Sequence, residues 1–262
     1  MTEPPPEPAR RLVEGIVGRV DAWEPVRGGW RVAAGDRRAF AKAALDAGAV
    51  DGLRNECAVL LSVASPHLPV VLGAHVDGPD VGVLVLEDLT GAAWPPPWPD
   101  DLSGAVEALR SLHAQPVPER LVPFGDLARR GWAIVDVDPA LADEAWLARA
   151  LPALRDAEAR VRLAGTELVH GALEAERICF AGDRVVVVGW ADAGAGNGAR
   201  DLAALALAAR LGGGPALDVP DAGGWAAHLA ADALLAGDEE RARAALAWAC
   251  EELELPPPPD GR

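Results

Sequence analysis

The segment "WPPPWP" at residues 94–99 restricts the fold of this chain more than any other stretch of the sequence. Proline fixes φ and has no backbone N–H, so a run of prolines interrupts helices and central strands alike. The apolar patterns on its two sides also differ. We therefore predict a seam between two lobes, 12–92 and 93–255. Further proline clusters at 3–8 and 256–259 predict frayed tails.

The lobe before the seam is predicted to be rich in β structure. Short apolar runs are separated by "RGG" and "GDR", which favour turns. Three such runs predict an antiparallel meander, at 21–26, 30–34 and 38–45. One helix and two further strands are predicted to follow, at 49–64, 70–76 and 81–89.

The lobe after the seam is predicted to be mainly helical. Apolar residues recur every three or four positions in five segments, at 101–114, 139–164, 199–211, 221–236 and 238–254. A polar, hairpin-like stretch at 168–192 interrupts these helices, where the apolar runs 167–169 and 184–188 flank a loop. The pattern predicts an α+β fold of two lobes with a cleft between them, and such clefts hold ligands.

The charge of the chain excludes some partners. Forty acidic and 24 basic residues give a net charge of −16, which repels the phosphates of nucleic acids and anionic lipids. We therefore expect neither a nucleic acid nor a membrane as partner. No apolar run is long enough to span a bilayer, and "MTEPPPEPARR" at the start lacks the apolar segment of a secretory signal, so we expect a cytoplasmic protein.

The three cysteines are too few and too scattered for a disulfide framework. Cys57, Cys179 and Cys250 form no CxxC pair and no Cys/His cluster with metal-ligand spacing. We predict three buried thiols and no metal site.

Lys42 is the only lysine, because the other 23 of the 24 basic residues are arginines. It lies in the third predicted strand. Lysine presents a compact point charge where arginine presents a planar fork, so the two are not interchangeable between phosphates and a carboxylate. The position of Lys42 in this strand is therefore stronger evidence for a functional role than the fact that it is the only lysine.

Six motifs occur in order over residues 40–203: "FAKA", "RNECAVL", "LVLEDL", "ALRSLHAQP", "LVHGALEAERICF" and "VVVVGWADAGAGNGARDLA". In this order and spacing, the chain resembles the aminoglycoside phosphotransferase and choline kinase-like superfamily, which shares the protein-kinase fold. The resemblance implies a small antiparallel β lobe with one helix, followed by a larger, mainly helical lobe.

The resemblance also implies a nucleotide-binding half. Lys42 would pair with nucleotide phosphates, Glu56 would be its helix partner, and the hinge from Glu87 to Leu89 would offer backbone groups to an adenine ring. A lysine on a rigid strand beside a carboxylate on a packed helix is held pointing at a phosphate. Taken alone, Glu56 is more typical of a solvated helix residue. Because the only lysine of the chain lies at the matching position, we favour an ion pair between Lys42 and Glu56 over a solvated Glu56.

The catalytic half of the resemblance is degenerate. The superfamily loop runs His-Gly-Asp with an Asn five residues later, and its metal strand ends in Asp before an aromatic residue. The first Asp accepts the proton of the substrate hydroxyl, while the Asn and the second Asp hold magnesium. The matching positions here are Ala172, Arg177 and Gly189. The resemblance leaves only His170, which braces the loop in this superfamily, and Asp201, which resembles the acid that fixes the following helix.

Three acidic residues nearby are candidates for compensation, namely Asp192, Glu174 and Glu176. Asp192 lies three positions past Gly189, where a residue faces the other way or has left the strand. The two glutamates would have to turn inward past Arg177.

Arg177 itself has two interpretations. In the first, its guanidinium contacts the phosphates of a nucleotide bound without magnesium. In the second, it forms an ion pair with one of these three acids. We favour the second, because an ion pair within the protein needs no ligand.

The main functional hypothesis is therefore a pseudoenzyme, or pseudokinase, of the aminoglycoside phosphotransferase-like type. It would act by binding a nucleotide, a small molecule or a partner protein, with ATP or another nucleotide held without magnesium. The alternative is an active ATP-dependent small-molecule phosphotransferase whose rearranged site uses Asp192 and a loop glutamate. Non-phosphoryl chemistry in the same pocket is a third possibility, which no residue positively supports.

Overall fold

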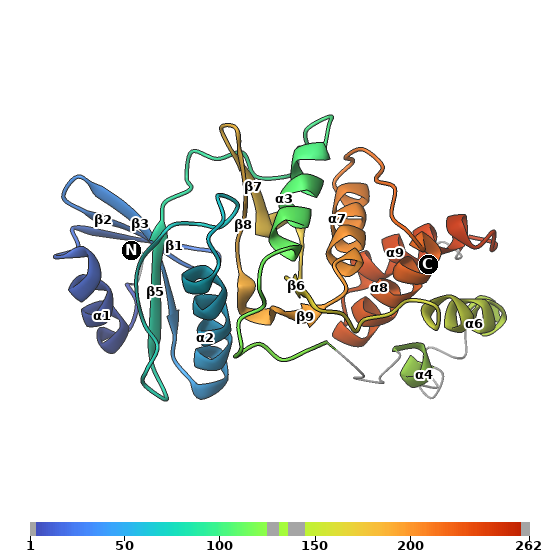
Figure 1. Ribbon diagram of the computed structural model, residues 1–262, viewed down its shortest axis with the longest axis horizontal. Coiled ribbons are helices and arrows are strands. Elements are labelled where there is room, and N and C mark those ends of the chain that lie inside the picture. Colours follow the sequence, from blue (N-terminus) through green and yellow to red (C-terminus); the bar gives the residue numbers. More distant parts are fainter. Residues whose placement is uncertain (1–3, 125–130, 136–144, 258–262) are drawn as a thin grey trace.

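The computed structural model describes residues 4–124, 131–135 and 145–257. A β-sheet with two helices forms one end of the molecule, a group of helices forms the other, and two short pairs of strands lie between them with α3 (Ser103–His113) (Figure 1). This arrangement confirms the predicted α+β fold with two lobes. The exact bounds of the two lobes stay a prediction.

The N-terminal sheet is antiparallel, with its five strands in the order β1-β2-β3-β5-β4. The strands are β1 (Ala22–Val26), β2 (Gly29–Ala34), β3 (Arg37–Ala44), β4 (Val71–His75) and β5 (Gly82–Glu87). The predicted meander is present as β1, β2 and β3. Its two turns contain Gly28 and Gly35 at φ 81° and 58°, a region of backbone space that glycine enters without strain.

One helix covers each face of this sheet, α1 (Glu7–Val17) and α2 (Ala47–Ser62). Successive side chains of a strand point to opposite faces, so the apolar residues divide into two sets. The set that packs with α1 includes Val32, Ala41, Val83 and Val85. The set that packs with α2 includes Leu84 and Leu86. The side chain of Asp46 accepts a hydrogen bond from the Ala49 N–H and so caps the start of α2.

Helix α1 was not predicted, because the prolines at 3–8 indicated a frayed tail. The helix begins within that cluster, with Pro8 in its first turn. A proline fits there because the first N–H groups of a helix have no partner within the helix. Ala9 and Val13 are fully buried against the sheet, and this tertiary packing stabilises the helix.

Two short antiparallel pairs follow the sheet in the chain. One joins β6 (Glu167–Val169) to β9 (Gly194–Gly196), and the other joins β7 (Ile178–Ala181) to β8 (Arg184–Val187). The two apolar runs that were expected to flank the loop are therefore not partners. A tight turn with Gly182 at φ 62° pairs β8 with the run directly before it.

The C-terminal helices lie close to their predicted positions. They are α3 (Ser103–His113), α7 (Ala199–Leu211), α8 (Ala222–Ala236) and α9 (Glu239–Glu252). The helix expected at 139–164 is represented by α6 (Ala145–Glu158), which ends earlier. Beyond it the Leu163 carbonyl accepts a hydrogen bond from the Asn197 N–H, so the chain is drawn alongside β9. Residues 139–144 of that prediction lie outside the described residues, and a short helix, α4 (Gly131–Val135), comes earlier in the chain.

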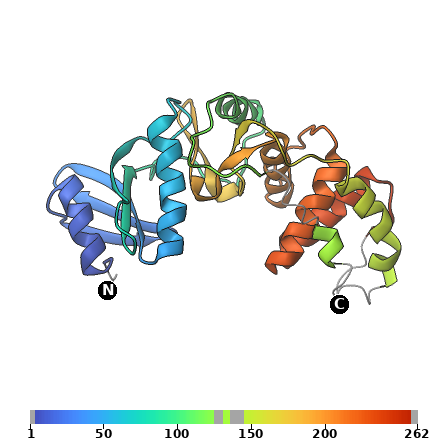
Figure 2. The same cartoon turned by 60° about the horizontal axis from the view of Figure 1, so that its bottom comes forward.

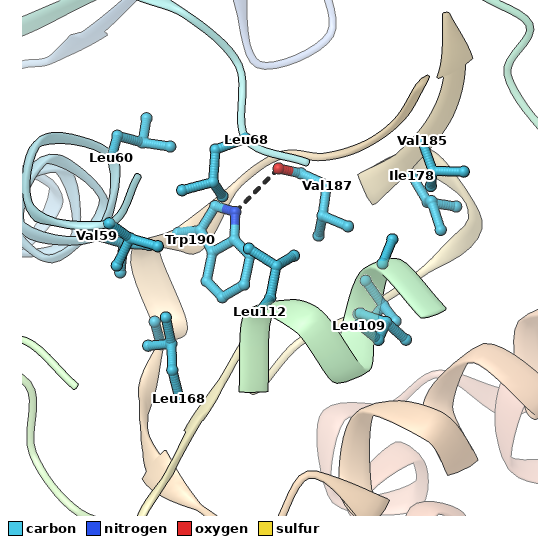
Figure 3. Close-up of a cluster of buried hydrophobic side chains, with 14 of the residues drawn as sticks. Val59, Leu60, Leu68, Leu109, Leu112, Leu168, Ile178, Val185, Val187 and Trp190 are labelled. Atoms are coloured by element: carbon cyan, nitrogen blue, oxygen red, sulfur yellow. Dashed lines mark hydrogen bonds between the residues drawn. The ribbon is translucent and has the colours of Figure 1, made fainter. Parts of the chain in front are cut away.

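Two apolar cores hold these elements together. One joins α6, α7, α8 and α9 at the end of the molecule opposite the sheet (Figure 2). The other runs from α2 through β8 to α3, and Trp190 lies fully buried within it (Figure 3). The indole N–H of Trp190 donates to the Val187 carbonyl at 2.9 Å. In the ranges that the structure describes, no helix is both long and apolar enough to cross a membrane.

Candidate functional site

Lys42 and Glu56 form an ion pair between β3 and α2. The Lys42 Nζ lies 2.7 and 2.8 Å from the two carboxylate oxygens of Glu56. The Glu56 side chain is only 2% exposed, whereas that of Lys42 is 20% exposed. The structure therefore brings together the two residues that the sequence pairs, with the lysine at the open end of the pair.

The carboxylate of Glu56 has a third donor, which links α2 to the C-terminal lobe. The backbone N–H of Gly189 donates to its Oε1 at 3.2 Å. Gly189 follows β8 and adopts φ 82° and ψ 51°, the left-handed conformation. Gly189, where the resemblance implies a metal ligand, is therefore bonded to the Lys42–Glu56 pair through its backbone N–H.

Asp201, in the first turn of α7, braces the loop that follows β6. Its carboxylate accepts the backbone N–H groups of His170 at 2.7 Å and of Gly171 at 3.2 Å. It also lies 3.0 Å from the His113 Nε2 atom on α3. Burial alone would raise the pKa of Asp201, but the His113 hydrogen bond and the neighbouring histidines outweigh it and hold the pKa below its ordinary value. Asp201 thus stays ionised inside the protein.

His170 fixes the loop from the other side. Its Nε2 lies 3.0 Å from the Val188 carbonyl, and its Nδ1 accepts the Ala172 N–H at 3.3 Å. These partners define the tautomer, since a carbonyl can only accept and an N–H can only donate. Burial lowers the pKa of His170, which is therefore neutral near pH 7. Its ring packs at 4.8 Å on the indole of Trp190, which Figure 3 shows within the core.

The loop therefore retains its frame, and its chemical positions are Ala172, Arg177 and Gly189. Ala172 offers only a methyl group where a general base would be needed. Arg177 ends the short 3-10 helix η1 (Ala175–Arg177), and its Nη1 donates to the Gly189 carbonyl at 2.7 Å. A Cβ placed on Gly189 would lie 2.6 Å from this Nη1 and 2.9 Å from the Arg177 Cδ. Arg177 thus fills the space that a side chain at Gly189 would occupy.

Arg177 does not pair with the three acids that we favoured as its partners. Glu174 pairs instead with Arg241 at the start of α9, at 3.0 Å. Glu176 pairs with Arg27 in the β1–β2 turn. Asp192 is exposed at the end of the 3-10 helix η2 (Trp190–Asp192), and its side chain forms no ion pair with any described residue. Each of the two glutamates forms its ion pair with another arginine, and the Arg177 guanidinium donates to the Gly189 carbonyl instead.

The hinge is tied into the sheet. The N–H of Glu87 donates to the Val70 carbonyl, and its carboxylate accepts from the Val70 N–H and from Arg184 on β8, at 2.8 and 2.7 Å. Glu87 therefore serves as a link between the two lobes, and its N–H is not turned towards a ligand. The Leu89 carbonyl accepts the Ala92 N–H in a turn. Contact between this hinge and an adenine ring stays a prediction.

Several contacts of the site had no sequence signal. Arg200 on α7 donates to the Gly171 carbonyl and stacks over the Phe124 ring at 4.9 Å. Arg120 binds Asp51 and Asn55 on α2, both at 3.1 Å. Arg120 lies outside the six motifs and Arg200 lies within the last of them beside Asp201, but in an arginine-rich chain neither is distinguished from the other arginines before the fold is known.

The residues do not fit a magnesium ion. Magnesium requires oxygen ligands in near-octahedral geometry, usually with at least one carboxylate. Gly189 and Ala172 have no side-chain oxygen, and the Arg177 guanidinium is a fixed cation at the place of the amide ligand. Across the described ranges, no three His, Cys, Asp or Glu side chains gather as a metal site would require.

The fold is shared with solved phosphotransferases. A thermostable mutant of the aminoglycoside phosphotransferase APH(4)-Ia has a TM-score of 0.62 at 15% identity, covering 94% of this chain and 98% of that one. A choline/ethanolamine kinase family protein from Mesorhizobium loti gives 0.58 at 21% identity, over 94% and 91%. Choline kinase LicA from Streptococcus pneumoniae gives 0.59 at 11% identity, over 92% and 98%.

These similarities establish the fold that aminoglycoside phosphotransferases and choline kinases have in common, as the six motifs predicted. No protein-family model matches the sequence, and no curated protein matches it.

Proposed function

We propose that this protein is a pseudoenzyme of the aminoglycoside phosphotransferase-like fold. It binds a nucleotide, a small molecule or a partner protein in the cytoplasm and does not catalyse magnesium-dependent phosphoryl transfer. The observation that carries this proposal is the contact between Arg177 and Gly189, since the guanidinium occupies the space of a metal-ligand side chain. The residues that remain, Lys42, Glu56, His170 and Asp201, position other groups.

The missing groups account for the loss of activity. A general base typically contributes a factor of about 10² to 10⁴ in rate, and preorganised charge at a transferring phosphoryl group contributes at least as much. The side chain of Ala172 can accept no proton. A cation at Arg177 can stabilise charge on a phosphate, but it cannot align an attacking hydroxyl.

One observation favours a second candidate, an active enzyme with a rearranged site. The Asp192 backbone carbonyl lies against Gly171, in contact distance of where a Cβ would stand, and the Asp192 carboxylate is exposed. This carboxylate is the nearest candidate for a displaced base, because Glu174 and Glu176 are both paired with arginines.

The test is consumption of ATP and GTP by the purified protein, with magnesium and with choline, aminoglycoside or other hydroxylated acceptors. We expect no consumption above background. The Lys42→Met variant serves as control, since any turnover that persists in it comes from a contaminating kinase. Turnover that disappears in both Lys42→Met and Asp192→Asn would refute the pseudoenzyme and support the rearranged site.

A further inference from the structure

We propose that Arg177 is a built-in cation that replaces the metal, so that the cleft binds a metal-free polyphosphate group and magnesium antagonises this binding. The inference deepens the proposed function and rests on it, because it concerns the same cleft. It assigns a chemical class of ligand, a chain of at least two phosphates, and an ionic condition for binding.

The first argument is the balance of charge around Gly189. The charge of Lys42 is matched by Glu56 at 2.7 Å, and burial keeps His170 neutral. Arg177 has no carboxylate in ion-pair contact among the described residues. Its guanidinium makes one hydrogen bond there, to the Gly189 carbonyl at 2.7 Å. A half-buried guanidinium with several unused N–H donors and no matching anion favours an anionic ligand.

The second argument is the geometry of the cationic groups. Glu56 binds the Gly189 N–H and Arg177 binds the Gly189 carbonyl, so Lys42, through Glu56, and Arg177 are both anchored to the backbone of one residue. Two cationic groups in such an arrangement suit a ligand with successive anionic groups, and a planar guanidinium matches phosphate oxygens in pairs.

A third cation, Arg27, is joined to the loop that carries Arg177. Arg27 belongs to the β1–β2 turn and reaches Glu176 in the loop, which closes the turn onto the loop. Both side chains are exposed, at 78% and 50%, so the pair contributes little free energy and is screened by salt. Arg27 can therefore exchange Glu176 for a phosphate when a ligand enters.

Magnesium opposes binding for two reasons. Magnesium bound to a polyphosphate removes two negative charges from the ligand, and it brings a divalent cation towards the fixed charge of Arg177. No carboxylate at position 172 or 189 offsets that repulsion. Magnesium therefore competes with the protein for the polyphosphate and weakens its binding. In a metal-dependent phosphotransferase, magnesium instead strengthens the binding of the phosphates.

The experiment is calorimetric titration with tripolyphosphate and with ATP, first in EDTA and then at increasing magnesium chloride. Sodium chloride holds the ionic strength constant, because monovalent salt alone weakens contacts between exposed charges. We expect both probes to bind in EDTA and saturating magnesium to raise the apparent Kd by roughly tenfold or more.

The variants assign the effect to Arg177. Arg177→Gln should weaken metal-free binding by roughly tenfold or more and remove the antagonism by magnesium. Arg177→Lys, which keeps the charge, should retain part of that antagonism. Arg160→Gln is the matched control, because it removes an exposed arginine beyond α6 and should change neither property. Circular dichroism establishes that each variant is folded.

Three results would overturn the inference: tighter binding with magnesium, unchanged binding by a folded Arg177→Gln variant, or no binding of either probe in EDTA. Each of them leaves the proposed function standing if no turnover is found. Magnesium-dependent turnover of ATP that is lost in Lys42→Met would instead refute the proposed function itself.

Discussion

The Arg177 guanidinium lies 2.7 Å from the Gly189 carbonyl oxygen and occupies the place where a side chain at Gly189 would begin. The Arg177 side chain leaves no room for a Cβ at position 189, so arginine at position 177 requires glycine at position 189. The same two positions would carry an amide and a carboxylate in the resembling superfamily. In this protein the two positions hold an arginine and a glycine that fit each other.

Gly189→Ala should therefore destabilise the protein by about 1–3 kcal/mol, because alanine is strained at a left-handed φ and its Cβ contacts Arg177. In an Arg177→Ala background the contact is absent and only the backbone strain remains. The double variant should be more stable than the sum of the two single changes by about 1 kcal/mol. Urea denaturation of all four proteins measures this coupling, and strict additivity would mean that Arg177 does not occupy this space in solution.

Restoring all three positions with Ala172→Asp, Arg177→Asn and Gly189→Asp should create a magnesium site. Two carboxylates and an amide then supply oxygen ligands where the structure has a methyl group, a hydrogen and a cation. Some stability is lost because the backbone at Gly189 has a left-handed φ, which aspartate tolerates better than most residues but less well than glycine. Calorimetry should show that magnesium now tightens ATP binding. A folded triple variant without that gain would show that the cleft differs from a metal site in further ways.

Lys42→Met should cost about 3 kcal/mol in the free energy of unfolding, because it leaves the buried carboxylate of Glu56 without its counter-charge. Adding Glu56→Gln should recover much of that loss, since an uncharged amide can still accept the Gly189 N–H. Chemical denaturation at pH 7.5 compares the three proteins. A double variant no more stable than Lys42→Met would show that burial of the Glu56 charge is not the cause.

The stability of the fold should fall as the pH is lowered. The folded pKa of His170 lies below its ordinary 6.5, so the unfolded chain takes up the proton first and stability is lost as pH falls below about 6.5. Asp201 has a folded pKa below its ordinary 3.8, so its contribution is present above that pH and is lost as pH falls through the folded pKa. Between pH 7 and 5, His170 is therefore the residue to test.

Urea denaturation at pH 7 and pH 5 should show a smaller pH effect in His170→Gln than in the unmodified protein. His75→Gln is the matched control, since His75 is exposed and its removal should leave the pH effect unchanged. An equal pH effect in His170→Gln and the unmodified protein would show that His170 is not the residue that titrates.

The cysteines should be unreactive until the protein unfolds. All three are buried, as the sequence predicted, and burial raises the pKa of Cys57 to about 11 and of Cys179 to about 12. The nucleophile is the thiolate, which is scarce at pH 8 for such groups. We expect no fast reaction with a disulfide reagent in native buffer and three thiols in denaturant. A rapidly reacting thiol in the native protein would indicate local opening.

Patterns within single elements were sufficient to predict most of the architecture. The glycine turns and alternating strands around Lys42 predict the meander, and helical spacing of apolar residues predicts α2 and α7. The resemblance implied the Lys42–Glu56 pair, and the structure holds the two side chains together because both residues lie on regular elements, β3 and α2. The resemblance implied that Asp201 fixes the following helix, and the structure shows that its carboxylate also binds the loop after β6.

Only the tertiary structure decided how the charged side chains pair. The partners of Arg27, Glu174 and Arg177 are separated along the chain or reached by flexible side chains, so no local pattern encodes them. The pairing of β6 with β9, and the helix that begins among the first prolines, likewise depend on surfaces that exist only after the chain has folded. The sequence by itself thus indicated the fold, because local periodicity and the six motifs both point to it, and it placed Ala172, Arg177 and Gly189 where the resemblance implies catalytic groups. The structure decided that Arg177 fills the vacated space, because that depends on the relative position of β7, β8 and Gly189 in the folded protein.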